Sequence, residues 1–235
     1  MENEIIILIT SAFEVGEALK DSSIRLIFCS PYVRTIQTAS QIAKHKNIKI
    51  RLEYGVIEWH GPKQQVITHT FFLINIKVNP RPVAELASMF PGLIDTDYQS
   101  IYPLPNYLES KKLLEERSKQ IMKKLSERFT GHAKGAIAIV THAATTVTLT
   151  RGILGAPEAE VRCGVCSIGK LRKNLQGQWT QELNGYSSHL SGGEMYHWEF
   201  PEDIKRKKKL QQLQETSSTN SMQIQPPDDN NEDED

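Results

Sequence analysis

The feature that most constrains the fold is an alternation of short apolar runs with segments of helical spacing. Ile24 to Cys29 and Ala136 to Val140 are compact apolar runs of strand length, and Ile48 to Leu52 alternates as a strand does. Tyr32 to Lys44 lies between the runs Ile24 to Cys29 and Ile48 to Leu52 and shows helical spacing. These three segments are therefore predicted to form a βαβ unit. Strands alternating with helices predict a three-layer α/β fold, with a mostly parallel central sheet and helices on both faces.

The second half of the chain continues the same pattern. Ser110 to Phe129 is a long amphipathic segment with an apolar stripe and a charged face, and Gly131 ends it. A further helix is predicted from about Ala144 to Leu154. Two alternating segments follow, near Val165 to Leu171 and Gln178 to Leu183, and each is predicted to be a strand.

Length and charge predict one domain with a tail. A chain of 235 residues suits a single domain of roughly 200 residues, which we place at residues 1–204. Residues 205–235 pass from the basic cluster Lys205 to Lys209, through a polar run, to an acidic end, and this composition predicts disorder. The basic cluster leaves nuclear localisation or phosphate binding open, although a solvated tail is the simpler interpretation. With 28 basic and 28 acidic residues, the balance favours neither nucleic acid nor an anionic membrane as a partner.

The cellular context follows from cysteines and apolar runs. Three cysteines, an odd number, and an acidic rather than basic N-terminus indicate a reducing compartment, and we expect a soluble cytoplasmic protein. The apolar run Ile5 to Ile9 is too short for a signal peptide. We predict instead that it forms a strand leading into a helix from about Ser11. The run Val66 to Val78 falls short of a membrane span.

Two short motifs follow predicted strands and carry groups suited to phosphate chemistry. The first motif is Ser30-Pro31-Tyr32-Val33-Arg34-Thr35-Ile36-Gln37-Thr38-Ala39, and it places Arg34 in the first turn of a helix. The second is Val140-Thr141-His142-Ala143, and it places His142 at the start of the helix that follows the strand Ala136 to Val140. Ligands bind beyond the carboxyl ends of strands in α/β sheets, where helix N-termini favour anions. The planar fork of Arg34 suits two phosphate oxygens, and Glu58, beyond the intervening strand, is placed to donate a proton.

Each candidate also has a purely structural interpretation. His142 is also well explained as a buried, hydrogen-bonded core histidine. Glu58, taken alone, would be interpreted as a carboxylate in a loop. A lone Cys163-Gly164-Val165-Cys166 has no second pair to complete a zinc site, so no metal or cofactor is expected. The remaining histidines show no ligand spacing and are interpreted as surface or structural residues: His45, His60, His69, His132, His189 and His197.

Together the motifs resemble the histidine phosphatase (phosphoglycerate mutase-like) superfamily, and most closely the phosphatase domain of the ubiquitin-associated and SH3-domain-containing phosphatases. The resemblance runs, with gaps, from about Thr10 to about Pro201. It implies removal of phosphate from a phosphorylated small molecule or phosphoprotein through a phosphohistidine. It further implies that Arg34 binds phosphate, that His142 is the second, phosphate-contacting and catalytic histidine, and that Glu58 is the acid. A homodimer is left open.

One element of that family's pattern has no counterpart. The chain contains no Arg-His dipeptide, whereas the family's nucleophile lies in an Arg-His-Gly segment. Residues 64–79, around the apolar run Val66 to Val78, are interpreted as an insertion into a family-like passage. Two hypotheses follow: a hydrolase of which this chain is an incomplete part, or a catalytically inactive phosphate-binding or scaffolding protein. A partner-binding role of the charged tail is a third, weaker one.

Overall fold

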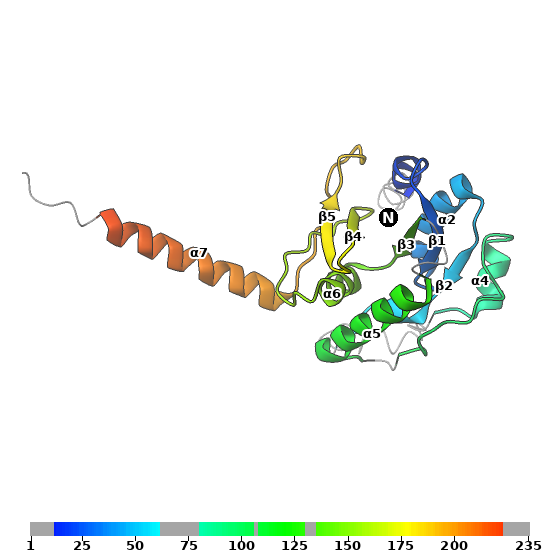
Figure 1. Ribbon diagram of the computed structural model, residues 1–235, viewed down its shortest axis with the longest axis horizontal. Coiled ribbons are helices and arrows are strands. Elements are labelled where there is room, and N and C mark those ends of the chain that lie inside the picture. Colours follow the sequence, from blue (N-terminus) through cyan, green and yellow to red (C-terminus); the bar gives the residue numbers. More distant parts are fainter. Residues whose placement is uncertain (1–11, 62–79, 106–107, 130–134, 223–235) are drawn as a thin grey trace, which may run out of the picture. The chain divides into compact units, whose positions relative to one another are not determined.

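The computed structural model describes residues 12–61, 80–105, 108–129 and 135–222 (Figure 1). The chain divides into two units, Met1–Trp198 and Glu199–Asp235. The predicted strand at Ile5 to Ile9, the insertion at residues 64–79 and the acidic end of the tail lie outside the described residues, and these three proposals remain predictions. Within the described ranges, no helix has the length and apolar character that crossing a membrane requires.

The larger unit is built on a parallel sheet of strands β1 (Ile24–Cys29), β2 (Ile50–Leu52) and β3 (Ala136–Val140). Their spatial order is β2-β1-β3, with Cys29 opposite Leu52 on one side and Val140 on the other. The predicted bounds of β1 and β3 are confirmed, and β2 begins two residues later than predicted. This sheet and its helices confirm the predicted α/β fold.

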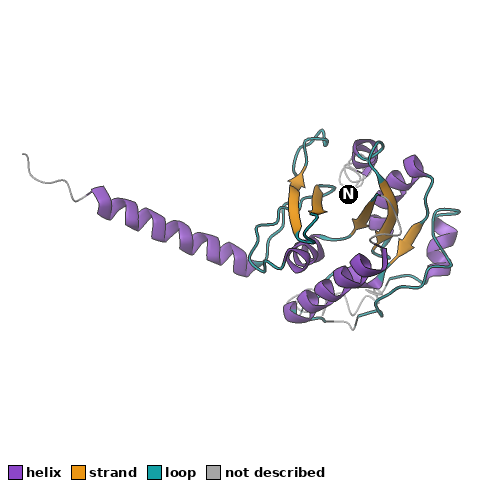
Figure 2. Ribbon diagram, in the orientation of Figure 1, coloured by secondary structure: helices purple, strands orange, loops and turns teal. Residues whose placement is uncertain are grey.

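Helices cover both faces of the sheet, as Figure 2 shows. On one face, Ile27 and Cys29 of β1 pack against α2 (Val33–Lys46) and α4 (Val83–Met89). On the other, Phe28 packs against α5 (Lys111–Phe129) and α6 (Ala143–Leu154). Successive residues of a strand point to opposite faces, which explains why the apolar run of β1 serves two separate cores. Residues 12–18 are also helical.

The two later strands form a separate hairpin. β4 (Ile168–Lys173) and β5 (Trp179–Tyr186) pair with each other in antiparallel fashion. The sequence pattern predicted two strands here but not which partners they take. In the described part of the chain they make a two-stranded sheet of their own.

The smaller unit contains helix α7 (Pro201–Met222). This differs from the predicted disorder, which began at residue 205: residues 205–222 are helical. The segment is rich in Lys, Gln, Glu and Leu, which are good helix formers, and Glu202 and Asp203 lie in the first turn, where the helix dipole favours acidic side chains. Local propensity therefore gives this polar segment a helix without a packed core.

Candidate active site

Three side chains from different parts of the chain meet at the carboxyl edge of the sheet. Arg34 lies in the first turn of α2, directly beyond β1, and His142 is the N-cap of α6, beyond β3. Glu58 follows the short 3₁₀ helix η1 (Tyr54–Val56), beyond β2. Arg34 Nη2 lies 3.1 Å from both Glu58 Oε2 and His142 Nδ1, and His142 Nδ1 lies 3.1 Å from Glu58 Oε2. The structure thus brings the three predicted site residues together, while their roles in binding and catalysis stay predictions.

The imidazole of His142 is buried and held on both sides. Its Nε2 lies 2.8 Å from the buried Ser30 Oγ, and the Tyr32 ring meets it edge-on, with centroids 5.5 Å apart. With its proton on Nδ1, the ring donates to Glu58 and accepts from Ser30. With the proton on Nε2, it donates to Ser30 and accepts from Arg34. Either neutral tautomer is fully hydrogen-bonded, so these contacts are compatible with an uncharged ring.

The electrostatics of the site point the same way. Burial lowers the pKa of His142 from its ordinary value, although the hydrogen bond and charge of Glu58 oppose this. Burial alone would raise the pKa of Glu58, but the hydrogen bond and charge of His142, with the charge of Arg34, bring the net pKa below its ordinary value. The site therefore holds a neutral imidazole and an ionised carboxylate at neutral pH.

The backbone before Glu58 is anchored by residues around His142 and by α5. Thr141 Oγ1 donates to the Val56 carbonyl at 2.6 Å, and Thr145 Oγ1 donates to the Ile57 carbonyl at 2.9 Å. The buried Arg117 of α5 donates to the Gly55 and Ile57 carbonyls through Nη1. Every carbonyl from 55 to 57 is therefore hydrogen-bonded, and this fixes where Glu58 emerges.

Arg117 is itself held by a buried ion pair. Its Nε and Nη2 donate to the two carboxylate oxygens of Glu109 at 2.9 and 2.7 Å, and Trp59 Nε1 donates to the Glu109 carbonyl at 2.8 Å. Both charged side chains are almost fully buried. Sequence reasoning missed this pair. The signal was a basic residue on the apolar stripe of α5, one turn from Leu114 and Ile121.

A second buried carboxylate organises the loop after β2. Glu53 is fully buried and accepts hydrogen bonds from one backbone N–H close by and from a group of residues far along the chain. These donors are the Gly55, Ile101 and Tyr102 amides and the Tyr98 and Ser100 hydroxyls. A carboxylate with five donors is fully satisfied, so Glu53 has a structural role.

Two further residues flank the site. Tyr32 OH lies 2.9 Å from His60 Nε2, and the Arg34 guanidinium lies 4.8 Å above the centre of the Tyr32 ring. Burial lowers the pKa of His60, which the sequence analysis treated as a surface or structural residue. Tyr32 therefore contacts Arg34 through its ring and His60 through its hydroxyl group.

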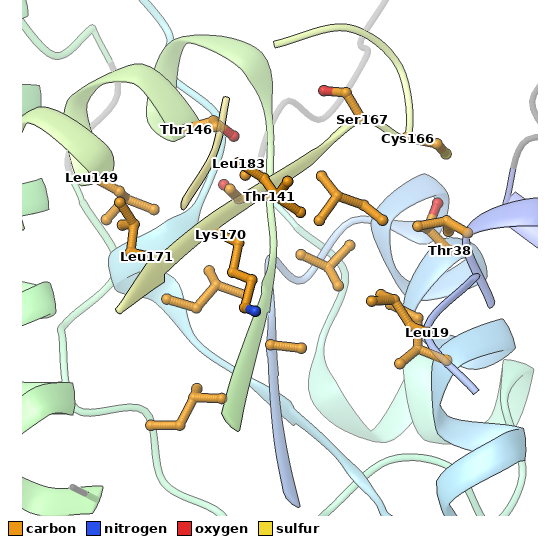
Figure 3. Close-up of a pocket in the computed structure, with 18 of the residues that line it drawn as sticks. Leu19, Thr38, Thr141, Thr146, Leu149, Cys166, Ser167, Lys170, Leu171 and Leu183 are labelled. Atoms are coloured by element: carbon orange, nitrogen blue, oxygen red, sulfur yellow. The ribbon is translucent and has the colours of Figure 1, made fainter. Parts of the chain in front are cut away.

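The site opens into a long groove. Arg34, Glu58 and His142 line one part of a groove of about 1770 Å³ that is also lined by residues of β3 and of the β4–β5 hairpin. Figure 3 shows Thr141 and Thr146 along this groove, with the apolar side chains of Leu149 and Leu171. In the described ranges, no three His, Cys, Asp or Glu side chains gather as a metal site would require.

The comparisons with known proteins agree with this arrangement. The model of the histidine phosphatase superfamily (branch 1) matches residues 9–73. This part of the chain is similar to the histidine phosphatase superfamily. The transcription factor tau 55 kDa subunit of Saccharomyces cerevisiae is 26% identical over 212 residues, which cover 77% of this chain and 47% of that protein. Human ubiquitin-associated and SH3 domain-containing protein A is 33% identical over 157 residues, covering 63% of this chain and 22% of that protein.

Two solved structures share the fold of this chain. The ecdysone phosphate phosphatase from Bombix mori, in complex with tungstate, superposes with a TM-score of 0.59 at 15% identity, covering 75% of this chain and 69% of that one. Bacillus stearothermophilus YhfR gives a TM-score of 0.52 at 19% identity, covering 78% and 84%. At these identities the likeness is one of fold. The chain spans less than half the length of the curated relatives described above.

Proposed function

We propose that this chain binds the phosphoryl group of a phosphorylated small molecule or phosphoprotein at Arg34 and His142, without hydrolysing the ester at an enzymatic rate. The observation that carries the proposal is the convergence of Arg34, Glu58 and His142 within 3.1 Å of one another at the carboxyl edge of the sheet. The similarity of residues 9–73 to the histidine phosphatase superfamily supports a phosphoryl ligand.

The geometry supports anion binding. The Arg34 side chain is 54% exposed, so its guanidinium is accessible from the groove and offers a planar fork to two phosphate oxygens. His142 caps α6, and the helix N-terminus beside it presents backbone N–H groups and the positive end of the helix dipole. These features favour a doubly charged oxyanion between α2 and α6.

Turnover is disfavoured because neither His142 as the nucleophile nor Glu58 as the acid is in a suitable state. The 235 residues contain no Arg-His dipeptide, and both ring nitrogens of His142 are engaged, one by Ser30 and the other by Arg34 and Glu58. Although burial opposes it, the hydrogen bond with His142 and the charge of Arg34 hold the pKa of Glu58 below its ordinary value, so Glu58 has no proton to give a leaving oxygen at neutral pH. Loss of a covalent nucleophile typically lowers the rate by several orders of magnitude.

Two assays on the purified chain test the proposal. Calorimetric titration with vanadate should show binding that the Arg34→Ala variant weakens at least about tenfold, the loss of one charge-assisted contact. Arg81→Ala, which removes an exposed arginine of the Glu85 ion pair, should bind as the wild type does. Hydrolysis of p-nitrophenyl phosphate should stay at background in all three proteins.

Two outcomes would contradict the proposal. Absence of vanadate binding to the wild-type chain would remove the phosphoryl-binding function. Robust hydrolysis that Arg34→Ala abolishes, with acid-labile phosphate trapped on His142, would instead establish a phosphatase in which His142 is the nucleophile.

A further inference from the structure

Tyr32 occupies an unusual position for an aromatic residue. It is the N-cap of α2, where serine, threonine, aspartate and asparagine are preferred because their side chains accept hydrogen bonds from the first N–H groups of a helix. The Tyr32 side chain makes no such bond. The turn is held instead by Thr35 Oγ1, which donates to the Ser30 and Tyr32 carbonyls. The Tyr32 ring therefore contributes nothing to capping, and its contacts are with the site.

Tyr32 contacts side chains from three parts of the chain. The Arg34 guanidinium of α2 lies 4.8 Å above the ring centre, and His142, the N-cap of α6, meets the ring edge-on with centroids 5.5 Å apart. The hydroxyl lies 2.9 Å from Nε2 of His60, which follows η1 in the chain. The hydrogen bond and the edge-on contact together fix the plane of the ring. The surface against which Arg34 lies is therefore itself held in place.

The ring and an oxyanion do not compete for the same group of Arg34. A cation–π attraction acts between the charge of the guanidinium and the face of the ring, and it requires no particular N–H group. Glu58 and His142, in contrast, both contact Arg34 Nη2. An oxyanion that takes a hydrogen bond from Nη2 competes with these two residues but not with Tyr32. The contact with the ring therefore stays available in the bound state.

Arg34 needs such a support. Its side chain is long, rich in rotamers and 54% exposed, and ion pairs at the surface hold a side chain only weakly. The pair with Glu58 is also lost when an anion takes its place. The apparent Kd of a site is its intrinsic Kd divided by the fraction of molecules in the binding-competent arrangement. A residue that keeps Arg34 in place therefore strengthens binding without touching the anion.

We propose that Tyr32 is a positioning residue of the phosphoryl site, whose ring keeps the Arg34 guanidinium in place while an oxyanion replaces Glu58. His60 supports this role by fixing the plane of the ring through its hydrogen bond. Removal of the ring should therefore weaken binding more than removal of the hydroxyl. The inference deepens the proposed function and rests on it.

Calorimetric titration of the full chain with inorganic phosphate tests the inference in three variants. Tyr32→Leu keeps an apolar side chain but removes the ring, and it should raise the Kd at least about fivefold, which corresponds to a binding-competent fraction of about one fifth. Tyr32→Phe keeps the ring and should raise the Kd by less than about twofold. Tyr102→Leu is the matched control, because it removes a tyrosine ring that lies 5.7 Å from Lys124 Nζ, and it should bind as the wild type does.

A measurement without ligand separates positioning from a general loss of packing. A group above an aromatic ring is shielded by it, so the Arg34 Nε–H proton signal of the wild type should lie upfield of its position in Tyr32→Leu. The same N–H should show restricted motion on the picosecond to nanosecond timescale in the wild type and free motion in Tyr32→Leu. A variant that had only lost packing would bind more weakly without either change at Arg34.

The outcomes distinguish this inference from the proposed function. Equal Kd values for the wild type and Tyr32→Leu, or an equal loss in Tyr32→Phe and Tyr32→Leu, would overturn the inference and leave the proposed function intact. Absence of phosphate binding to the wild type would overturn both. If Tyr32→Leu does not fold, the Arg34 signals of the wild type and Tyr32→Phe decide: restricted, upfield-shifted signals support the inference, and signals typical of a freely exposed arginine refute it.

Discussion

Replacing Glu58 with glutamine should strengthen oxyanion binding. The Glu58 carboxylate lies 3.1 Å from Arg34 Nη2, where it neutralises the guanidinium and repels an incoming phosphate. Two unit charges 4 Å apart interact by about 1 kcal/mol in bulk water and about 4 kcal/mol at an effective dielectric constant of 20. Because the Arg34 side chain is 54% exposed, the lower part of that range applies. A gain of about 1 to 2 kcal/mol corresponds to a Kd about 5- to 30-fold lower.

Calorimetric titration with inorganic phosphate at neutral pH and low salt measures this change. Glu85→Gln is the matched control, because it removes the carboxylate with which Glu85 of α4 pairs with Arg81 at the surface, and it should leave the affinity unchanged. Equal or weaker phosphate binding by Glu58→Gln, with Glu85→Gln at the wild-type value, would refute the reasoning that Glu58 competes with the anion for Arg34.

Two further predictions concern stability. Arg117→Ala should lower the free energy of unfolding by about 3 to 5 kcal/mol in urea denaturation, because it leaves the buried Glu109 carboxylate unpaired. Arg81→Ala, at an exposed pair, should cost less than about 1 kcal/mol, and equal losses for the two variants would contradict the buried-pair account. Because burial lowers the pKa of His142, the unfolded chain takes up the proton first, and stability should fall as pH drops through about 6.5, the ordinary histidine value. In His142→Gln, the free energy of unfolding should fall less steeply between pH 7.5 and 5.5. Part of the fall should remain, because burial also lowers the pKa of His60 and of His189. An unchanged slope would contradict a lowered pKa for His142.

The sequence predicted the elements whose signals are local. β1 and β3 were located because continuous apolar runs of strand length are bounded by turn residues, and Arg34 and His142 because each follows such a run at a helix start. Placement of Glu58 in the same site rested on the expectation that the carboxyl ends of parallel strands share one edge. The structure shows these three side chains in contact.

What the sequence did not predict depends on contacts between distant residues. Glu53 takes four of its five donors from residues 45 to 49 positions later, and Arg117 reaches carbonyls 60 and 62 positions earlier. No periodicity encodes such contacts. The pairing of β4 with β5 is likewise a choice of partner rather than a local preference. For α7 the signal was local and was missed. The low hydrophobicity of residues 205–222 predicted disorder, and the helix propensity of Lys, Gln and Leu was not considered.

Titration of the wild-type chain and Arg34→Ala with inorganic phosphate, followed through the imidazole NMR signals of His142, tests the central claim most directly. The account predicts a saturable shift of these signals in the wild type, because the bound anion displaces Glu58 from Nδ1, and a Kd at least about tenfold higher in Arg34→Ala. Signals that do not move in the wild type, or that move equally in both proteins, would contradict the claim that Arg34 and His142 form one phosphoryl-binding site.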